Sequence, residues 1–265
     1  MTIDFRKSRK ELIKNGYTLV PILDTSIIIE LKNIINLNFP EKQEFYNKMD
    51  RKKWHKQVLN VQDLINQKGL NLQLIHSQKD LVKQIIPSNS NRLGWVDVLK
   101  LRAVRPFKKT EIPDHVPFHR ETFYSSSQVV NQYNYWTPLT SSEEKSGLRI
   151  IPDTHIIKDE EIIVEKDSDH FTAVERYSAG HAIGYPYAPK IIKNLDKLAG
   201  KKEKVILVPE NHSILFSAML IHGNGMNMSD KTRFSIDTGF IPEEFITNNE
   251  PLFAAKNKPH YSLIK

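Results

Sequence analysis

The last two-thirds of the chain consist of short segments rich in β-branched and aromatic residues, and this pattern constrains the fold more than any other feature. Pro, Gly or Asn bounds these segments, and no regular helical pattern separates them. Several strands without intervening helices predict a sandwich, jelly roll or barrel. The predicted strands lie within residues 95–107, 126–139, 146–155, 204–209, 212–223 and 232–242.

The first 95 residues have a mainly helical pattern around one short extended segment at residues 17–23. A helical pattern before this segment stops at Gly16, and glycine commonly ends helices. Asp24 can cap an apolar helix that follows it. We therefore expect one domain over residues 1–265. Its expected parts are a helical region (1–95), a β core (96–243) and a polar, loop-like tail (244–265).

Composition favours a folded protein without cysteine chemistry. Hydrophobic residues make up 39% of the chain and charged residues 26%, which allows a sizeable core. The absence of cysteine excludes disulfides, thiolate metal sites and cysteine nucleophiles. The first residues contain no apolar signal region, and no apolar run approaches the roughly 18 residues of a membrane span. We expect a soluble, cytoplasmic protein with no membrane partner.

The net charge of +7 comes from 38 basic and 31 acidic residues. Such a surplus attracts nucleic acid, an anionic membrane or an anionic small substrate. Much of it lies in lysine-rich stretches such as 51–53 and 201–204, which favours a solvated surface. No zinc-finger, RRM-like or helix-turn-helix pattern supports nucleic-acid binding. A small-molecule partner is therefore the main expectation, and the sequence does not define the oligomeric state.

The tripeptide His119-Arg120-Glu121 is a candidate for two metal ligands. Residues i and i+2 of an extended segment share a face, so His119 and Glu121 would both point inward. His222 ends a predicted apolar strand and can supply a third ligand. Two histidines and one carboxylate are the ligands of the non-haem iron facial triad. The alternative for the tripeptide alone is a surface histidine beside a surface glutamate.

The remaining histidines are weaker candidates, because none has a carboxylate two residues later on a predicted strand. His212 is placed to open a strand, and His155 is expected to be structural or at a site rim. The other histidines considered, all in loop-like or polar contexts, are His115, His170 and His181.

Arg233 and Ser235 follow His222 after a polar turn and share one face of an alternating segment. A guanidinium binds a carboxylate through two hydrogen bonds, and a serine hydroxyl can add another. The pair is therefore suited to hold a dicarboxylate. The alternatives are a salt bridge within the protein or an edge-strand arginine facing water.

Four segments in one order resemble the phytanoyl-CoA dioxygenase family of iron(II)/2-oxoglutarate-dependent oxygenases. They are residues 10–35, the HRE tripeptide, residues 134–155 and residues 220–236. The resemblance implies a double-stranded β-helix, a cupin-like jelly-roll core, with helices packed on one sheet. It also implies that His119, Glu121 and His222 hold iron(II).

The same resemblance implies a co-substrate site. Arg233, with Ser235, would bind the distal carboxylate of 2-oxoglutarate, and Asn134 and Trp136 would lie near the co-substrate or substrate. The implied reaction consumes O2 and hydroxylates a small molecule, with release of succinate and CO2. The alternatives are a non-catalytic jelly-roll binding protein, or the same iron chemistry giving desaturation, epimerisation or cyclisation.

The sequence departs from the family pattern at three places. Glu121 stands where aspartate is commoner, although it still supplies a ligand oxygen. Asp153-Thr154 replaces a typical Gly-Ser, and Asn211-His212 replaces a Gly-Asp turn. Halogenating members lack the carboxylate, so Glu121 argues against halogenation.

An anionic substrate is suggested by three arginines near predicted core strands: Arg102, Arg105 and Arg149. Arg102 and Arg105 would lie on opposite faces of a regular strand, so at most one points inward. Surface positions are the alternative for all three. The long connections at 40–95 and 156–204 are candidate lids. Side chains that could line a pocket from the second connection are Tyr177, His181, Tyr185 and Tyr187.

Overall fold

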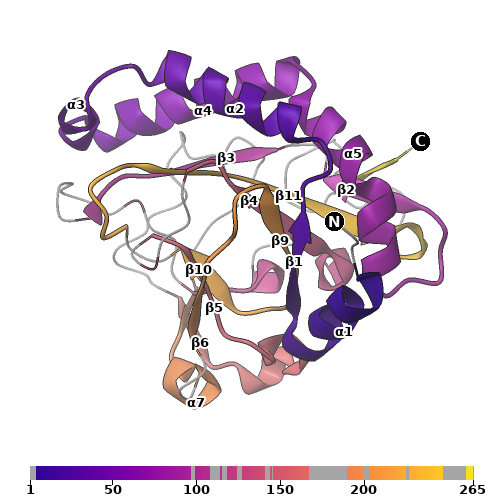
Figure 1. Cartoon of the computed structure of the whole chain (residues 1–265). Helices are drawn as coiled ribbons and strands as arrows, with labels where there is room; N and C mark the ends of the chain where they lie inside the picture. The colour runs from indigo at the N-terminus through magenta and orange to yellow at the C-terminus, as the bar shows by residue number, and fades with distance from the viewer. Residues whose placement is uncertain are drawn as a thin grey trace.

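A computed structural model describes most of the chain. The described residues are 4–96, 99–107, 114, 118–123, 127–140, 144, 146–166, 190–199, 203–224, 227–246 and 261–264. Figure 1 shows three layers: a helical layer, a large sheet beneath it, and a smaller sheet on the opposite side.

The large sheet is antiparallel throughout. Its main path runs β1 (Tyr17–Pro21), β9 (His212–Ser217), β4 (Tyr133–Pro138), β11 (Arg233–Pro242), β2 (Leu93–Val96) and β12 (Tyr261–Leu263). A further strand, β3 (Lys100–Val104), pairs with the first half of β11, while β2 pairs with its last residues. The long β11 therefore pairs with three strands of this sheet: β4, β3 and β2.

The smaller sheet is formed by β10 (His222–Asn224), β5 (Leu148–Ile150) and β8 (Lys204–Ile206). A separate strand pair is formed by β6 (Val164–Lys166) and β7 (Lys190–Ile192). Two facing antiparallel sheets with helices on one of them constitute the predicted double-stranded β-helix, or cupin-like jelly roll.

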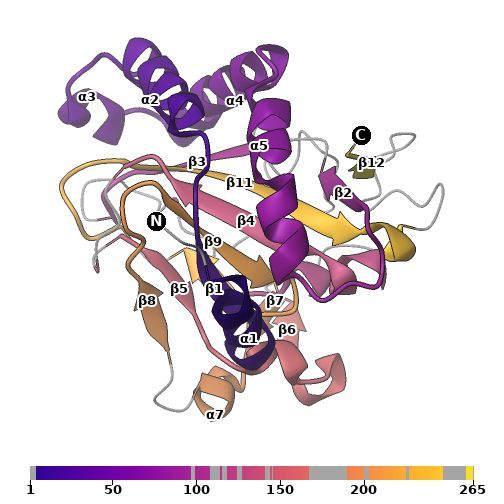
Figure 2. The same ribbon diagram turned by 45° about the vertical axis from the view of Figure 1, so that its right-hand side comes forward.

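Five helices precede the β core, as the helical pattern predicts. They are α1 (Phe5–Asn15), α2 (Thr25–Asn38), α3 (Gln43–Asn47), α4 (Arg51–Gln67) and α5 (Leu70–Ile85). Gly16 ends α1 with a φ of 83° and donates its N–H to the Leu12 carbonyl, and the Asp24 side chain caps α2. Figures 1 and 2 both show α2, α4 and α5 on the outer face of the large sheet.

Alternation along the strands separates two cores. Leu215, Phe234 and Phe240 face the helices and join the core beneath α2, α4 and α5. Trp136 and Phe216 face the smaller sheet and pack in a second core with Ile150. The face of the large sheet that looks toward the smaller sheet is called the inner face below. A short helix, α7 (Leu195–Ala199), lies beyond the smaller sheet (Figure 2).

Several predicted boundaries are wrong. The segment 212–223 is two strands, because the chain turns after Ser217, where the Leu220 N–H bonds the Ser217 carbonyl at 2.9 Å. His222 therefore opens β10, rather than ending the preceding strand. Residues 95–107 contribute to two strands, and Ser127–Asn131 is a 3-10 helix ahead of β4.

The expected loop-like tail is also wrong in part, because it supplies β12. This strand pairs antiparallel with β2, with Tyr261 opposite Val96. Tyr261 and Ile264 are both buried, which explains why the tail is held to the sheet. The large sheet thus takes strands from all three expected parts of the chain.

At two positions where the family typically has glycine, this chain has Asp153 and Asn211 but keeps a backbone conformation that favours glycine. Asp153 has a φ of 67° and Asn211 a φ of 59°, both in the left-handed region. Asp and Asn tolerate this region better than other non-glycine residues. The Asp153 N–H bonds the Asn15 carbonyl at 3.1 Å, and the Asn211 carbonyl accepts the Ile22 N–H at 2.8 Å. Both turns are therefore anchored to the N-terminal part of the chain.

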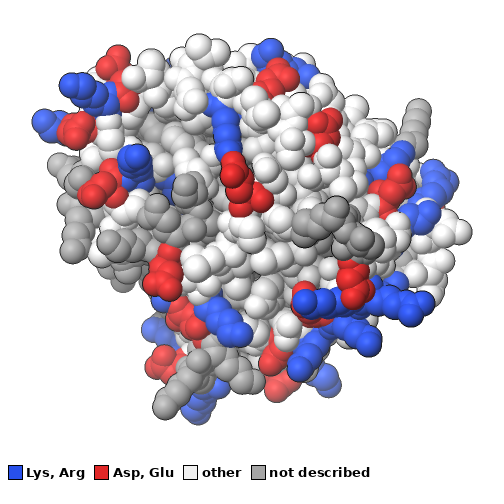
Figure 3. All heavy atoms as spheres, viewed as in Figure 1, with Lys and Arg blue, Asp and Glu red and all other residues white. Residues whose placement is uncertain are grey.

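None of the helices in the described residues is both long and apolar enough to cross a membrane. Figure 3 shows lysine and arginine side chains interspersed with acidic ones over the face in view. This mixed distribution is the one expected of a solvated charged surface.

Candidate metal centre

His119 and His222 lie side by side at the edge of the smaller sheet. The His119 N–H bonds the His222 carbonyl at 2.8 Å, and the His222 N–H bonds the His119 carbonyl at 3.0 Å. The centroids of their imidazole rings are 4.4 Å apart. This backbone bridge brings together two histidines that are separated by about a hundred residues in the sequence.

Glu121 completes the cluster. Its Oε1 lies 3.9 Å from His119 Nε2 and 3.5 Å from His222 Nε2. One donor atom from each of the three residues lies within 4.8 Å of the other two, and all three residues are buried. Two imidazole nitrogens and one carboxylate oxygen in this arrangement fit a facial iron site with open positions.

The backbone around the tripeptide differs from the extended segment expected. Glu121 opens a short 3-10 helix, Glu121–Phe123, and its N–H bonds the Ala218 carbonyl at 3.1 Å. Arg120 is fully buried, and its Nη1 donates to Asp159 Oδ1 at 2.7 Å. Its Nη2 also donates to the Thr154 carbonyl. These bonds anchor the residue between the two candidate ligands.

Thr154 also supports the chain just before His222. Its hydroxyl accepts the Ile221 N–H at 2.9 Å. The His222 Nδ1 lies 2.8 Å from the Leu220 carbonyl, which can only accept a hydrogen bond. Nδ1 therefore carries a proton, and Nε2, which faces Glu121, is the ring nitrogen that would bind a metal once it is deprotonated.

Glu121 is held by a chain of polar side chains. Asn134 Nδ2 donates to Glu121 Oε1 at 3.1 Å, and the Gln132 amide donates to Asn134 Oδ1. The Tyr261 hydroxyl donates to Gln132 Oε1 at 2.8 Å. Gly239 makes room for this chain, because a Cβ there would lie 3.0 Å from Gln132 Nε2.

The electrostatic surroundings favour an ionised Glu121. Burial acts against the carboxylate, but the hydrogen bond with His222 and the nearby Lys100 ammonium outweigh it. The pKa of Glu121 is therefore lowered below its ordinary value. An ionised carboxylate is the form that binds a metal.

Arg233 and Ser235 lie on the inner face of β11, as the alternation predicts. Arg233 is buried, and its Nη1 donates to the Ser146 carbonyl at 2.7 Å. Its Nε and Nη2 find no hydrogen-bond partner among the described residues, and neither does the Ser235 hydroxyl. The nearby Trp136 Nε1 is likewise unmatched within the described part of the chain. The guanidinium carbon lies 6.0 Å from the centre of the Trp136 ring.

These unmatched donors identify a candidate carboxylate site. Burial, with a smaller effect of Arg102, lowers the pKa of Arg233 to about 10. A buried cation and several buried donors are costly unless an acceptor satisfies them. A carboxylate of a bound dicarboxylate supplies that acceptor, so the residues present fit 2-oxoglutarate.

Two charged residues of the inner face, Lys100 and Asp237, were not predicted. Asp237 lies opposite Lys100 in the β3–β11 pairing, and Ser235 lies opposite Arg102. Arg102 Nη2 is 3.5 Å from Asp237 Oδ2. The two-residue period that identified Arg233 and Ser235 continues to Asp237, and Lys100 precedes Arg102 by two residues. The alternation in the sequence could therefore have predicted that Lys100 and Asp237 lie on the inner face.

The structure does not bring Arg105 to the site. Its Nε and Nη2 bond the Asp114 carboxylate at 2.7 and 3.0 Å, and its Nη1 bonds the Tyr46 and Met49 carbonyls. The guanidinium also stacks over Trp54, on the helix side of the sheet. Arg105 is therefore held by structural contacts, contrary to a substrate role.

Arg149 also lies away from the inner face. Its neighbours Leu148 and Ile150 pack in the core between the sheets, so the alternating Arg149 points outward. It forms an ion pair with Glu203 and lies over the Phe118 ring. Of the three candidate substrate arginines, only Arg102 is on the inner face.

The structure places two further histidines considered in the sequence, and the remaining candidates lie outside the described residues. His212 opens β9 as predicted, and His155 Nε2 contacts the Ile13 carbonyl at 3.0 Å, a structural position. The candidates that fall outside the described residues are His115, His170, Tyr177, His181, Tyr185 and Tyr187.

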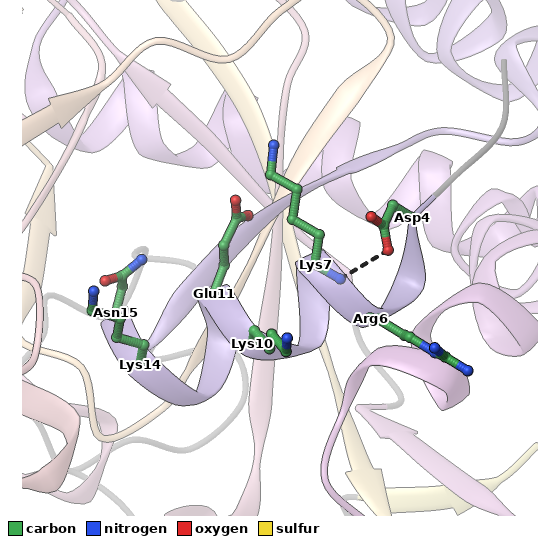
Figure 4. Close-up of a pocket in the computed structure, with 7 residues that line it drawn as sticks. All are labelled: Asp4, Arg6, Lys7, Lys10, Glu11, Lys14 and Asn15. Carbon is green, nitrogen blue, oxygen red and sulfur yellow. Dashed lines mark hydrogen bonds between the residues drawn. The ribbon is translucent and has the colours of Figure 1, made fainter.

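A hollow on the protein surface runs along α1 (Figure 4). It is lined by Asp4, Arg6, Lys7, Lys10, Glu11, Lys14 and Asn15. None of these residues belongs to the histidine–glutamate cluster or to the Arg233 site. The hollow is therefore separate from the candidate metal centre.

The chain matches a protein-family model. The phytanoyl-CoA dioxygenase (PhyH) family model matches residues 42–235, which is more than half of the chain. No curated protein is similar enough in sequence to match the chain.

Solved structures share the fold at low sequence identity. EvdO2 from Micromonospora carbonacea var. aurantiaca, complexed with 2-oxoglutarate, has a TM-score of 0.59 and 12% identity, over 98% of this chain and 96% of that one. EctD from S. alaskensis, with 2-oxoglutarate and 5-hydroxyectoine, has a TM-score of 0.57 and 13% identity, over 97% of this chain and 82% of that one. The epimerase SnoN, in complex with Fe3+, alpha ketoglutarate and nogalamycin RO, has a TM-score of 0.53 and 12% identity, over 98% of each chain.

The match to the family model covers the HRE tripeptide, the second histidine and Arg233. The cluster of His119, Glu121 and His222 lies at the edge of a double-stranded β-helix. This chain belongs to the phytanoyl-CoA dioxygenase family.

Proposed function

We propose that this protein is an iron(II)- and 2-oxoglutarate-dependent oxygenase that hydroxylates a small molecule. One observation carries the proposal: buried donors of Arg233, Ser235 and Trp136, which have no hydrogen-bond partner among the described residues, accompany a two-histidine, one-carboxylate cluster in the same β-helix. A metal site alone fits many proteins. A metal site accompanied by buried donors that suit a carboxylate fits a reaction that consumes 2-oxoglutarate.

Each residue has a defined role in this proposal. His119, Glu121 and His222 hold iron(II) and leave its other positions open to ligands. The Arg233 guanidinium binds the distal carboxylate of 2-oxoglutarate, and Ser235 and Trp136 donate to the same group. Asn134 orients Glu121 through its amide, rather than binding the co-substrate directly. The bound iron supplies the oxidation chemistry with O2.

The overall reaction is balanced by the co-substrate. One molecule of 2-oxoglutarate, one O2 and one substrate C–H group give succinate, CO2 and a C–OH group. The family match supports the oxygenase class, and the complexes of EvdO2 and EctD with 2-oxoglutarate are consistent with this co-substrate. The burial of the cluster favours a site that excludes bulk water.

A second candidate is the same iron chemistry with a different outcome. SnoN, which has a similar fold, is an epimerase. Desaturation and cyclisation also use the same ligands and co-substrate. Product analysis separates these outcomes, because only hydroxylation adds an oxygen atom from O2 to the product.

Succinate formation tests the proposal without knowledge of the substrate. The purified protein is supplied with iron(II), 2-oxoglutarate and O2, and slow conversion of 2-oxoglutarate to succinate is measured. We expect conversion by the wild type and its loss in His222→Ala. The surface variant Arg92→Ala is the control, since Arg92 is exposed and pairs only with Glu243 in the described ion pairs. If the protein binds these ligands without catalysis, neither the wild type nor the control variant will form succinate.

A further inference from the structure

Arg120 lies between the two candidate ligands of the HRE tripeptide, and its side chain is fully buried. Its Nη1 donates to Asp159 Oδ1 at 2.7 Å, and its Nη2 donates to the Thr154 carbonyl. The guanidinium is therefore bonded to the segment that follows β5, whereas the donor atoms of its two neighbours meet at the candidate metal site. A planar guanidinium with two acceptors in fixed directions leaves little freedom to the residue that carries it.

Thr154 is also bonded to the chain beside the other histidine. Its buried hydroxyl accepts the Ile221 N–H at 2.9 Å and donates to the Ile151 carbonyl at 2.7 Å. The Ile151 N–H donates in turn to the Ile221 carbonyl at 2.9 Å. These bonds hold the residue just before His222. Thr154 therefore contacts both ligand segments, through its carbonyl to Arg120 and through its hydroxyl to Ile221.

The backbone of the tripeptide does not by itself direct both of its ligands to one side. Residues i and i+2 share a face in a strand, but Glu121 opens a 3-10 helix, in which residues three apart lie above one another. The backbone bonds between His119 and His222 set the spacing of the two segments. The bonds of Arg120 add a second fixed point, between the two ligands of the tripeptide.

The segment that carries Thr154 is itself held against the end of α1. The Asp153 N–H donates to the Asn15 carbonyl at 3.1 Å, and His155 Nε2 lies 3.0 Å from the Ile13 carbonyl. Both carbonyls belong to the last turn of α1, where carbonyl groups lack partners within the helix. Thr154 lies between these two contacts, so it is a fixed point from which the ligand segments can be held.

We propose that Thr154 and Arg120 are positioning residues of the metal site, which hold His222 and the HRE tripeptide in the relative orientation that iron(II) requires. Neither residue contacts the metal in this proposal. Thr154 acts through the peptide before His222, and Arg120 acts through its two neighbours in the chain. Loss of partners that orient metal ligands weakens metal binding by about 10- to 100-fold. This inference rests on the proposed function, because the metal is the iron of that same site.

Binding of iron(II) to the metal-free protein tests the role of Thr154, and this measurement needs neither substrate nor turnover. Thr154→Val removes the hydroxyl but keeps the shape of the side chain, whereas Thr154→Ser keeps the hydroxyl. Anaerobic calorimetry measures the affinity. We expect an affinity about 10-fold lower in Thr154→Val, and an affinity near the wild-type value in Thr154→Ser.

Thr137→Val is the matched control for the loss of a buried hydroxyl. Thr137 is buried in β4, and its hydroxyl lies 2.6 Å from the Ser213 hydroxyl. It follows Trp136, which faces the smaller sheet, so Thr137 points to the helix side. Both valine variants should unfold at a lower denaturant concentration than the wild type. Only Thr154→Val should lose iron(II) affinity, which separates the positioning of ligands from a general loss of stability.

Asp159→Asn tests the role of Arg120 from outside the core, and it keeps the proposal testable if Thr154→Val does not fold. The Asp159 side chain is 45% exposed, and the substitution removes the charge that Arg120 contacts. Glu160→Gln makes the same change of charge at the next residue, which is exposed and has no bond to Arg120 among the described residues. We expect iron(II) affinity to fall in Asp159→Asn and to stay at the wild-type value in Glu160→Gln. The fall should be smaller than in Thr154→Val, because Arg120 keeps its bond to the Thr154 carbonyl.

Wild-type iron(II) affinity in a folded Thr154→Val protein, or equal losses of affinity in Thr154→Val and Thr137→Val, would overturn the role of Thr154. Binding by Thr154→Ser that is as weak as that of Thr154→Val would also overturn it, because the hydroxyl is retained. Equal affinities in Asp159→Asn and Glu160→Gln would overturn the role of Arg120. If the wild-type protein binds no iron(II), the proposed function and this inference fail together. The two failures are therefore distinguishable.

Discussion

The Asn134 amide donates a hydrogen bond of 3.1 Å to Glu121 Oε1, the same oxygen that faces both histidines. The bond links β4 of the large sheet to the candidate ligand in the tripeptide. It fixes the orientation of the carboxylate, which would otherwise be free to rotate about its terminal torsion. Partners of this kind orient metal ligands and tune their affinity.

Replacing Asn134 should therefore weaken metal binding. For Asn134→Leu, we expect iron(II) affinity to fall by about 10-fold, the lower end of the range for lost partners of metal ligands. Anaerobic calorimetry measures the affinity. The control is Asn33→Leu, at an exposed position of α2. Wild-type affinity in a folded Asn134→Leu protein would show that the amide does not position Glu121.

The C-terminal strand should influence the metal site through Gln132. Tyr261→Phe removes only the hydroxyl that donates to Gln132 Oε1. We expect a loss of about 1 kcal/mol in the free energy of unfolding, typical of one hydrogen bond. We also expect a smaller decrease in iron(II) affinity than Asn134→Leu causes. Denaturant unfolding and calorimetry measure the two effects, and an unchanged affinity would limit Tyr261 to a structural role.

Arg233 should control the 2-oxoglutarate requirement rather than metal binding. For Arg233→Ala, we expect the co-substrate dissociation constant to rise roughly 10- to 100-fold, because hydrogen bonds to a charged group are lost. Iron(II) affinity should stay near the wild-type value, which serves as the internal control. A variant with normal 2-oxoglutarate affinity would show that the buried guanidinium has a different partner.

The arginines that lie away from the site should differ in their effects on stability. Arg105→Ala leaves Asp114 buried without its partner, and we expect a loss of roughly 3–5 kcal/mol. Arg149 is partly exposed, so its ion pair with Glu203 is weak, and Arg149→Ala should cost about 1 kcal/mol or less. Thermal and denaturant unfolding compare the two variants. A small loss in Arg105→Ala would contradict the structural role of that residue.

The sequence predicted most of the fold because the helix and strand patterns were strong. Gly16 and Asp24 have the conformations expected of helix ends, and alternation placed Arg233 and Ser235 on one face. The position of His222 within its strand was wrong, because the turn at Ser217 depends on contacts with other segments. One of these is the bond from the Ala218 N–H to the Gln132 carbonyl. Local periodicity carries no information about such a contact.

The residues around the candidate ligands were harder to predict. The chain from Tyr261 through Gln132 to Asn134 joins β12 to β4, and the tail carried no strand signal strong enough to place it. Arg105 and Arg102 lie in the same predicted strand segment, so the sequence did not distinguish their roles. The partner of Arg105, Asp114, lies beyond the strand in a segment without a regular sequence pattern, so the ion pair could not be predicted. Lys100 and Asp237 followed the alternation and could have been found by extending it.

The most direct test of the central claim is an anaerobic titration of the metal-free protein with iron(II) and 2-oxoglutarate, followed by visible absorption. We predict a weak band that appears only when both components are present. It should be absent in Glu121→Ala, which lacks the carboxylate ligand, and shifted to higher 2-oxoglutarate concentration in Arg233→Ala. No band in the wild type, or an unchanged band in Glu121→Ala, would contradict the assignment of this site.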